Sequence, residues 1–169
     1  CFFAKAQDYG TNIVKVNPLG ALFGSAQLAY EKALNEKSSF LIAPSFGFLK
    51  SGGFKYTTLG AGAEYRIYFR QNAPQGFYAA PGAGVSFGTA KVEDFFGEGE
   101  GEADKTNITG FSVKGIVGYQ WIFDSGFVLD LNGGIQFLNL KFKDKEGAFA
   151  SGAFSGILPA LGVSIGYNF

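Results

Sequence analysis

Residues Gly162 to Gly166 match the Gly-x-Ser-x-Gly pattern that carries the nucleophilic serine of many hydrolases. That serine needs a histidine base and a turn from a strand into a helix, which exposes its hydroxyl. The chain contains no histidine, and Ser164 lies inside a segment of alternating apolar residues. We therefore expect no serine hydrolase site, and the sequence predicts a protein that is not an enzyme and has no catalytic residues.

A second group with chemical potential is a run of carboxylates between residues 91 and 107. Its members are Glu93, Asp94, Glu98, Glu100, Glu102 and Asp104. Carboxylate oxygens suit Ca²⁺, but the spacing is not that of an EF-hand loop. We expect a solvated acidic external loop, with weak binding of a divalent ion or a partner as the alternative. Since histidine is absent, transition-metal sites are also disfavoured, and we predict no cofactor and no built metal site.

A third group consists of polar residues at alternate positions of apolar segments. It comprises Lys15, Asn17, Glu31, Glu64, Arg66, Lys114 and Asp130. Its three cations and three anions cancel, and charges withdrawn from water persist only when they are paired. We predict that they form a polar network of ion pairs in the interior of a barrel. The same residues leave two alternatives open, a narrow polar pore and a carboxylate pair in acid–base chemistry.

The scaffold for these side chains is clearest in the stretch 157–169. One face of it is wholly apolar and contains Ile157, Pro159, Leu161, Val163, Ile165, Tyr167 and Phe169. The other face holds small or polar residues. Alternation of this kind indicates a β-strand, and a strand of this length with one lipid-like face is typical of a transmembrane β-barrel.

The same alternation recurs in eight segments from residue 12 onward. The first two are about 12–22 and 25–34, and connections at 35–38, 50–56, 70–76, 91–107, 124–126 and 140–156 separate the rest. Connections after segments two, four and six are short and those after three, five and seven are longer, as in outer-membrane barrels. Since closure leaves no unpaired strand edge in lipid, we predict an all-β fold, an eight-stranded antiparallel up-and-down transmembrane β-barrel.

Aromatic residues on the apolar face gather near the ends of the predicted strands. One set is Phe40, Phe69, Phe77, Phe123, Phe127 and Phe169, and the other is Phe48, Phe87, Phe111 and Phe137. Two such sets predict aromatic girdles at the two membrane interfaces. The net formal charge is zero, so nothing indicates binding of nucleic acid, and no apolar run is long enough for a membrane helix.

The first six residues depart from this pattern. Cys1 to Ala6 resemble the end of a signal peptide, with Ala4 and Ala6 as the small residues before a cleavage site at Gln7. We predict that residues 1–6 end a signal peptide and that residues 7–169 form the outer-membrane β-barrel domain. Cys1 is the single cysteine, so no disulfide framework is expected. The alternative is that Cys1 is the first mature residue and carries a lipid.

Four stretches carry a resemblance to a known family. They are Asn12–Gly20, the pair Tyr30–Glu31, Ala63–Phe69 and the terminal Gly166–Phe169. The chain resembles a small outer-membrane barrel family common in bacteroidetes, similar in architecture to OmpA- and OmpX-type barrels. The resemblance implies location in the outer membrane of a Gram-negative bacterium and insertion by the barrel assembly machinery. It also implies a C-terminal assembly signal, to which we assign Gly162, Tyr167 and Phe169.

We expect a non-enzymatic outer-membrane barrel with a structural or partner-binding role, such as that of an accessory subunit in a larger outer-membrane complex. Its expected partners are outer-membrane lipid, the assembly machinery and other outer-membrane proteins. One alternative is a narrow pore for small solutes or ions. The other is a soluble exported barrel that binds a hydrophobic ligand inside, as lipocalins do.

Overall fold

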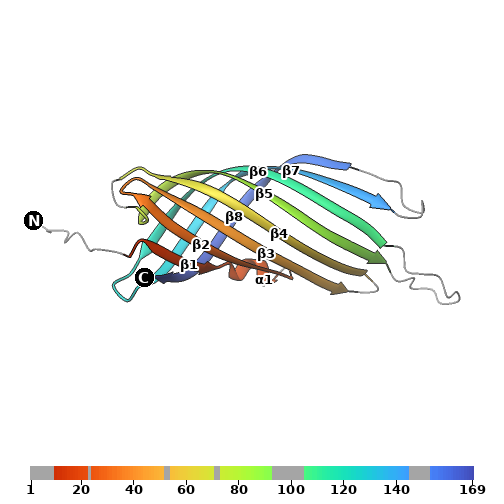
Figure 1. Ribbon diagram of the computed structural model, residues 1–169, viewed down its shortest axis with the longest axis horizontal. Helices are drawn as coiled ribbons and strands as arrows, with labels where there is room; N and C mark the ends of the chain where they lie inside the picture. The colour runs from red at the N-terminus through yellow and green to blue at the C-terminus, as the bar shows by residue number, and fades with distance from the viewer. Residues whose placement is uncertain (1–9, 23, 52–53, 71–72, 93–104, 145–152) are drawn as a thin grey trace, which may run out of the picture.

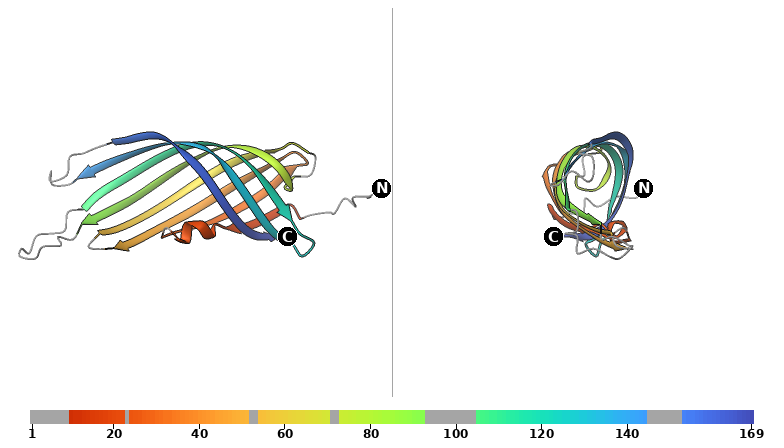
Figure 2. Two further views of the ribbon diagram at one scale, coloured as in Figure 1. Left: turned by 180° about the vertical axis from the view of Figure 1, so that it is seen from behind. Right: turned by 90° about the vertical axis from the view of Figure 1, so that its right-hand side faces the viewer.

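The computed structural model describes residues 10–22, 24–51, 54–70, 73–92, 105–144 and 153–169. Each strand pairs antiparallel with the next, and the last pairs with the first, so eight strands close into a barrel (Figure 1). The end-on view in Figure 2 shows the strands as a ring. The prediction of an eight-stranded up-and-down β-barrel is therefore confirmed.

The strands lengthen from 5 residues in β1 to 18 in β6 and β7, and β8 has 16. They are β1 (Asn12–Val16), β2 (Ser25–Asn35), β3 (Ser38–Ser51), β4 (Phe54–Tyr68), β5 (Gly76–Val92), β6 (Lys105–Ile122), β7 (Phe127–Asp144) and β8 (Ala153–Asn168). One short helix, α1 (Pro18–Leu22), follows β1. Within the described part of the chain, no helix is long and apolar enough to cross a membrane.

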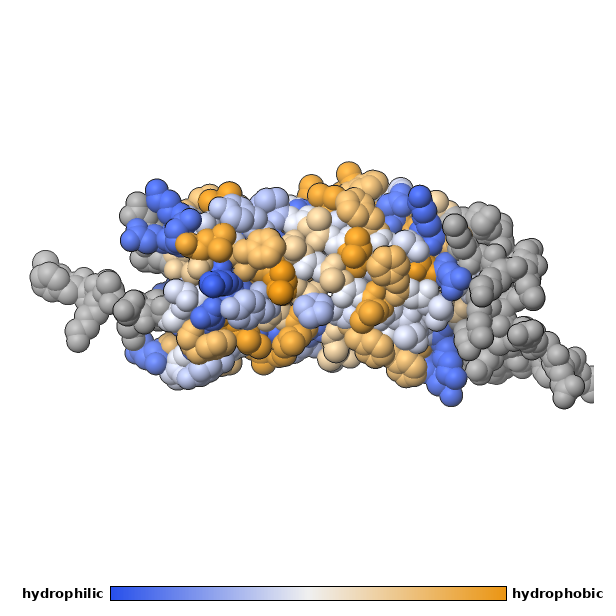
Figure 3. All heavy atoms as spheres, viewed as in Figure 1, coloured by the Kyte–Doolittle hydropathy of each residue, from blue (hydrophilic) through white to orange (hydrophobic). Residues whose placement is uncertain are grey.

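The two faces of the sheet differ as the alternation predicts. Large apolar side chains point outward and remain exposed, among them Leu161 (81% exposed), Ile157 (72%) and Leu59 (64%). They form an apolar band over the middle of the barrel, with hydrophilic residues gathered toward both ends (Figure 3). The buried residues lie inside, where apolar clusters such as Ile13, Ile122 and Val128 accompany the polar groups.

The first segment departs from the predicted strand over 12–22. β1 ends at Val16, and the chain then turns into α1. Asn17 Oδ1 accepts a hydrogen bond from the Gly20 amide at 3.2 Å, and Pro18 occupies the first helical position. An asparagine cap followed by proline satisfies and shapes the first turn of a helix, so this pair ends the strand early.

Several predicted connections are too long. β3 continues to Ser51 and β4 begins at Phe54, so the expected loop at 50–56 is mostly hairpin and is shorter than the connection from Tyr68 to Gly76. The predicted order of short and long connections is thus wrong after β3. Pairs such as Lys55 with Lys91 show the reason, since backbone pairing continues beyond the apolar stretch that marks a strand in the sequence.

Aromatic side chains line the rim at the end where β4 turns into β5. The ring centroids of Phe69 and Phe77 lie 6.0 Å apart, and those of Phe77 and Tyr119 are also 6.0 Å apart. Tyr119 contacts Trp121 at 4.4 Å. The neighbouring hairpin adds Phe123 and Phe127 at 5.7 Å. The first three contacts form a continuous aromatic arc over the ends of β4 to β6, and Phe123 with Phe127 form a separate pair.

Closure between β8 and β1 covers only part of β8. Because β1 is short, its register with β8 runs only from Ile13 opposite Asn168 to Val16 opposite Ile165. Among the described residues, the rest of β8, from Ala153 to Ser164, pairs with β7 alone. Helix α1 lies at this seam and contacts both β2 and β8. In the left view of Figure 2, β8 crosses in front of the barrel, with α1 beside its lower half.

Candidate functional site

The interior of the barrel is crossed by a cluster of charged side chains. Lys15 on β1 extends its ammonium to three acceptors, Glu31 Oε2 at 2.6 Å, Gln120 Oε1 at 2.7 Å and Asp130 Oδ2 at 2.9 Å. These acceptors come from β2, β6 and β7. One cation therefore links four strands, and its side chain is only 1% exposed.

Arg66 on β4 is the second hub of this cluster. Its Nη1 lies 2.6 Å from Asp130 Oδ2 and 3.2 Å from Glu31 Oε2, so both carboxylates are shared with Lys15. Its Nη2 lies 2.9 Å from Glu64 Oε2, whose other oxygen accepts a bond from Lys114 Nζ at 2.6 Å. All three carboxylates are thus paired with cations, which is the condition for keeping charges in a low-dielectric interior.

Neutral side chains complete the hydrogen bonding. The Tyr68 hydroxyl donates to Glu31 Oε1 and the Tyr78 hydroxyl donates to Asp130 Oδ1, both at 2.7 Å. Ser39 also donates to Glu31 Oε1, and Gln120 donates to the Pro74 carbonyl. The guanidinium carbon of Arg66 lies 4.4 Å from the centre of the Tyr78 ring. We refer to Lys15, Glu31, Arg66, Gln120 and Asp130 with Tyr68 and Tyr78 as the lumen cluster.

The strand register explains why these residues meet. Glu64, Arg66 and Tyr68 occupy alternate positions of β4 and therefore point to the same side. Across the sheet, Arg66 faces Ser39 and Gln120 faces Asp130. A period of two combined with antiparallel pairing thus brings residues from six strands to one level of the interior.

The predicted residues fall into three groups in the structure. The six charges lie together, with Lys114 at the periphery, where its side chain is 28% exposed. Asn17 stands apart from the charges and caps α1, and its Nδ2 lies 3.4 Å from Gln27 Oε1. Tyr167 and Phe169 are exposed near the end of β8, while Gly162 lies against the Asn132 side chain. The acidic residues from Glu93 to Asp104, like Cys1 to Ala6, lie outside the described residues.

The network predicted from the sequence did not include Tyr68, Tyr78, Gln120 or Ser39. Their hydroxyl or amide groups lie on inward positions of apolar strands, and this is the signal that could have identified them. Across the described ranges, no three His, Cys, Asp or Glu side chains are grouped to hold a metal ion.

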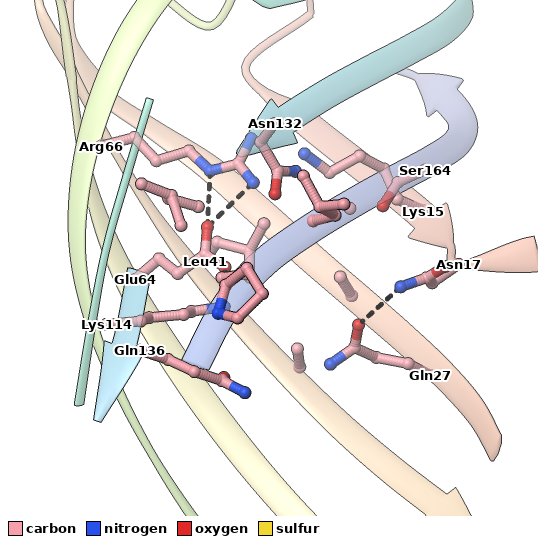
Figure 4. Close-up of a pocket in the computed structure, with 17 residues that line it drawn as sticks. Lys15, Asn17, Gln27, Leu41, Glu64, Arg66, Lys114, Asn132, Gln136 and Ser164 are labelled. Atoms are coloured by element: carbon pink, nitrogen blue, oxygen red, sulfur yellow. Dashed lines mark hydrogen bonds and ion pairs between the residues drawn. The ribbon is translucent and has the colours of Figure 1, made fainter. Parts of the chain in front are cut away.

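Next to the lumen cluster lies a cavity of about 200 Å³ (Figure 4). Its lining is mainly polar and includes Lys15, Glu64, Arg66 and Lys114 from the cluster and its edge, and Asn132, Gln136 and Ser164 from β7 and β8. Figure 4 shows Arg66, Glu64 and Lys114 on one side of the cavity, and Asn17 and Gln27 on the other. The cavity suits a small polar group or water, because its walls supply both hydrogen-bond donors and acceptors.

A second hollow, of about 500 Å³, lies on the outside of the barrel. Its walls come from β1, α1, β2 and β3 and are mostly apolar, with Val16, Pro18, Ala21, Leu28 and Phe46 among them. Asn17 and Gln27 line both this outer groove and the inner cavity. The two hollows therefore border the same pair of residues.

No protein-family model matches the sequence, and no curated protein matches it. Among solved structures, the chain is similar to the Yersinia pestis outer membrane protein Ail, described in a phospholipid bilayer nanodisc. That likeness has 13% sequence identity, covers 95% of this chain and 99% of that chain, and has a TM-score of 0.46. The resemblance to the bacteroidete barrel family stays a prediction.

Proposed function

We propose that this protein is an integral outer-membrane barrel with a non-enzymatic, structural or partner-binding role, as an accessory subunit of a larger outer-membrane complex. The observation that carries the proposal is the distribution of polarity across the barrel wall. Apolar side chains such as Leu161, Ile135 and Phe87 are exposed on the outer wall, while the charges of the lumen cluster are enclosed. In water this arrangement would leave a large apolar surface uncovered, whereas in a bilayer lipid covers it.

The same distribution disfavours the soluble, lipocalin-like alternative. A ligand-binding barrel in water needs its apolar face inside and its charges outside. Here Glu31 and Asp130 are fully buried at the centre, and Leu131, next to Asp130 on β7, points outward. The interior cavity is polar, so it offers little to a wholly hydrophobic ligand.

The lumen cluster also favours a structural role over conduction. Its side chains reach across the interior from six strands, and each charged group is held by two or more partners. An ion would have to displace these bonds, and leaving a buried charge unpaired costs several kcal/mol. The cluster therefore acts as a plug that ties the strands together.

The accessible surfaces for a protein partner are the lipid-facing wall and the strand ends. Tyr167 and Phe169 remain exposed on the outer surface at the end of β8. An aromatic strand end with its side chains exposed suits recognition by the barrel assembly machinery during insertion, the role we propose for Gly162, Tyr167 and Phe169.

Extraction of the protein from its native outer membrane in mild detergent tests the proposal. We expect it in the membrane fraction, with stoichiometric companion proteins and a folded form that migrates differently before and after boiling. Recovery without companions would remove the accessory-subunit role and leave a free-standing barrel. Recovery in the soluble fraction would contradict the membrane assignment itself.

A further inference from the structure

The interior cavity reaches the seam between β8 and β1, since residues of both strands line it. Of the residues of β8 that line it, Ala160, Gly162 and Ser164 point inward, as a lumen lining requires. Pro159 and Leu161 also line it, although they belong to the outward, lipid-facing set, and Leu161 is the most exposed large apolar residue described. The cavity therefore follows the backbone of β8 from Pro159 to Ser164 along the seam.

That edge is the part of β8 without a partner on the β1 side. Pairing with β1 stops at Ile165, so the backbone from Ala153 to Ser164 has a free edge among the described residues. Backbone at membrane depth is tolerated without a strand partner where it lines a water-filled cavity. The polar cavity beside Ser164 gives this edge a lining of that kind.

The opposite border of the cavity is the pair Asn17 and Gln27. Their side chains are joined by a single long hydrogen bond of 3.4 Å, and both residues also line the apolar groove on the outer wall. The Asn17 amide also donates to the Gln27 carbonyl at 3.1 Å, so the backbone pairing of β1 with β2 ends at this pair. The polar interior cavity and the apolar exterior groove therefore both border the end of that pairing. α1 stands at the same seam, and its Pro18 and Ala21 face the groove.

We propose that this seam is a lateral binding site for a single-chain amphiphile, with its polar head in the lumen cavity and its acyl chain in the groove beside α1. This inference rests on the proposed membrane location. The apolar groove matches an acyl chain, since Val16, Leu28 and Phe46 offer no polar partner.

The lining of the cavity indicates the class of head group. The charges in and around it cancel, because Lys15 and Arg66 are neutralised by Glu31 and Asp130, and Lys114 is paired with Glu64. The other polar groups are amides and a hydroxyl, from Asn17, Gln27, Asn132, Gln136 and Ser164. A net-neutral site of this kind suits an uncharged or zwitterionic head over a strongly anionic or cationic one.

The test uses the full barrel in nanodiscs and a lysophosphatidylcholine with a photoactivatable diazirine next to its head group. Bilayer lipid that stays outside can label only outward residues. We expect adducts on the inward residues Ala160 and Ser164 of β8, and on Gln27, at a level several-fold above those on Val85 and Val113 of the outer wall. A probe with the diazirine at the end of the acyl chain should label Val16 and Leu28 instead.

Two variants and one matched control test whether labelling of the inward residues depends on the cavity. Ala43→Trp places an indole in the cavity, because Ala43 lines it from β3. It should abolish labelling of Ala160 and Ser164. Gln27→Leu keeps the size of the border residue while removing its polar group, and it should reduce labelling several-fold even where Ala43→Trp folds poorly. Ala83→Trp on the exposed outer face of β5 is the control. In this variant, Ala160 and Ser164 should be labelled to the same extent as in the parent protein.

Adducts confined to outward residues of a folded, membrane-inserted barrel would overturn this proposal while leaving the membrane location intact. Unchanged inward labelling in a folded Ala43→Trp barrel would also overturn it. If inward labelling occurs in the isolated barrel but not in native membranes, another protein covers the free edge of β8, and the amphiphile site is wrong. Failure of the parent protein to insert would instead count against the membrane location.

Discussion

Arg66 on β4 and Asp130 on β7 meet across the interior of the barrel, with Arg66 Nη1 2.6 Å from Asp130 Oδ2. These strands are not neighbours in the sheet, since β5 and β6 lie between them. Lys15 on β1 shares the same carboxylate oxygen at 2.9 Å. The lumen cluster therefore connects strands that have no backbone pairing with each other, and it adds a cross-brace to the ladder of the barrel.

Removing the central cation should destabilise the barrel strongly. Lys15→Met keeps the length of the side chain and leaves Glu31 and Asp130 with Arg66 as their remaining cation. Breaking a buried pair on one side costs about 3–5 kcal/mol. We expect a loss of this size in the free energy of unfolding in lipid vesicles, measured by reversible urea titration.

Lys114→Met is the matched control for that change. Lys114 bonds to Glu64 at the edge of the cluster, and its side chain is partly exposed. Because this ammonium is partly exposed and bonds one carboxylate that also keeps Arg66, the loss should be clearly smaller than in Lys15→Met. Equal losses in the two variants would mean that the buried position of Lys15 has no special importance.

A charged side chain placed on the outer wall should lower the free energy of unfolding, and the loss should grow with the depth of the residue in the bilayer. Leu131 points outward in β7, and Leu131→Arg should cost about 2–4 kcal/mol if the residue meets the middle of the bilayer. Leu34 is also outward but lies next to the turn after β2, where the same change should cost roughly 0–1 kcal/mol. Vesicle unfolding measures both, and an unaffected Leu131→Arg barrel would show that this face does not meet lipid.

Substitution of Gly126, in the turn from β6 to β7, should destabilise the barrel. Its φ of +83° disfavours any L side chain by about 1–2 kcal/mol. In addition, a Cβ atom there would lie 2.7 Å from the Tyr167 ring. Gly126→Ala should therefore lower the unfolding free energy more than Gly76→Ala, where φ is also positive but nothing lies within 4 Å. A larger loss at Gly76 would refute this explanation.

The native barrel should not conduct ions in planar bilayers. A fourfold variant that replaces Lys15, Glu31, Arg66 and Asp130 with serine removes two cations and two anions, so the net charge is unchanged while the plug is lost. We expect stepwise currents from this variant alone, provided that it still shows the boiling-dependent gel shift of a folded barrel. Currents from the native protein that disappear in Arg66→Ala would instead establish the pore alternative.

Much of the fold was predictable because strand alternation is a local property. The outward face of β8 and the inward positions of Glu64 and Arg66 follow from a period of two, which needs no knowledge of partners. The ends of the strands were harder to predict from the sequence, since pairs such as Lys55 with Lys91 depend on hairpin register and not on apolar residues. The end of β1 at Val16 could have been predicted from Asn17 and Pro18. Asn17 caps α1 and Pro18 begins it, and this helix start outweighs the apolar pattern that continues beyond it.

The site was predictable only in its composition. Alternation placed Lys15 and Asp130 inside, but which carboxylate meets which cation depends on the stagger of strands around the ring. The unpaired edge of β8 was not predictable for a similar reason. It exists because β1 is much shorter than β8, and only the paired structure shows that the edge beside Leu161 has no strand partner among the described residues.

The most direct test of the account is fluorescence of Trp121, the single tryptophan, in vesicles of lipids brominated at different depths. Trp121 contacts Tyr119 on the aromatic rim of the outer wall. If this wall meets lipid, emission falls most with bromines near the head groups, less with bromines near the chain ends, and little with aqueous iodide. Emission that iodide quenches and that brominated lipids leave unchanged would contradict the claim that the apolar exterior lies in a membrane.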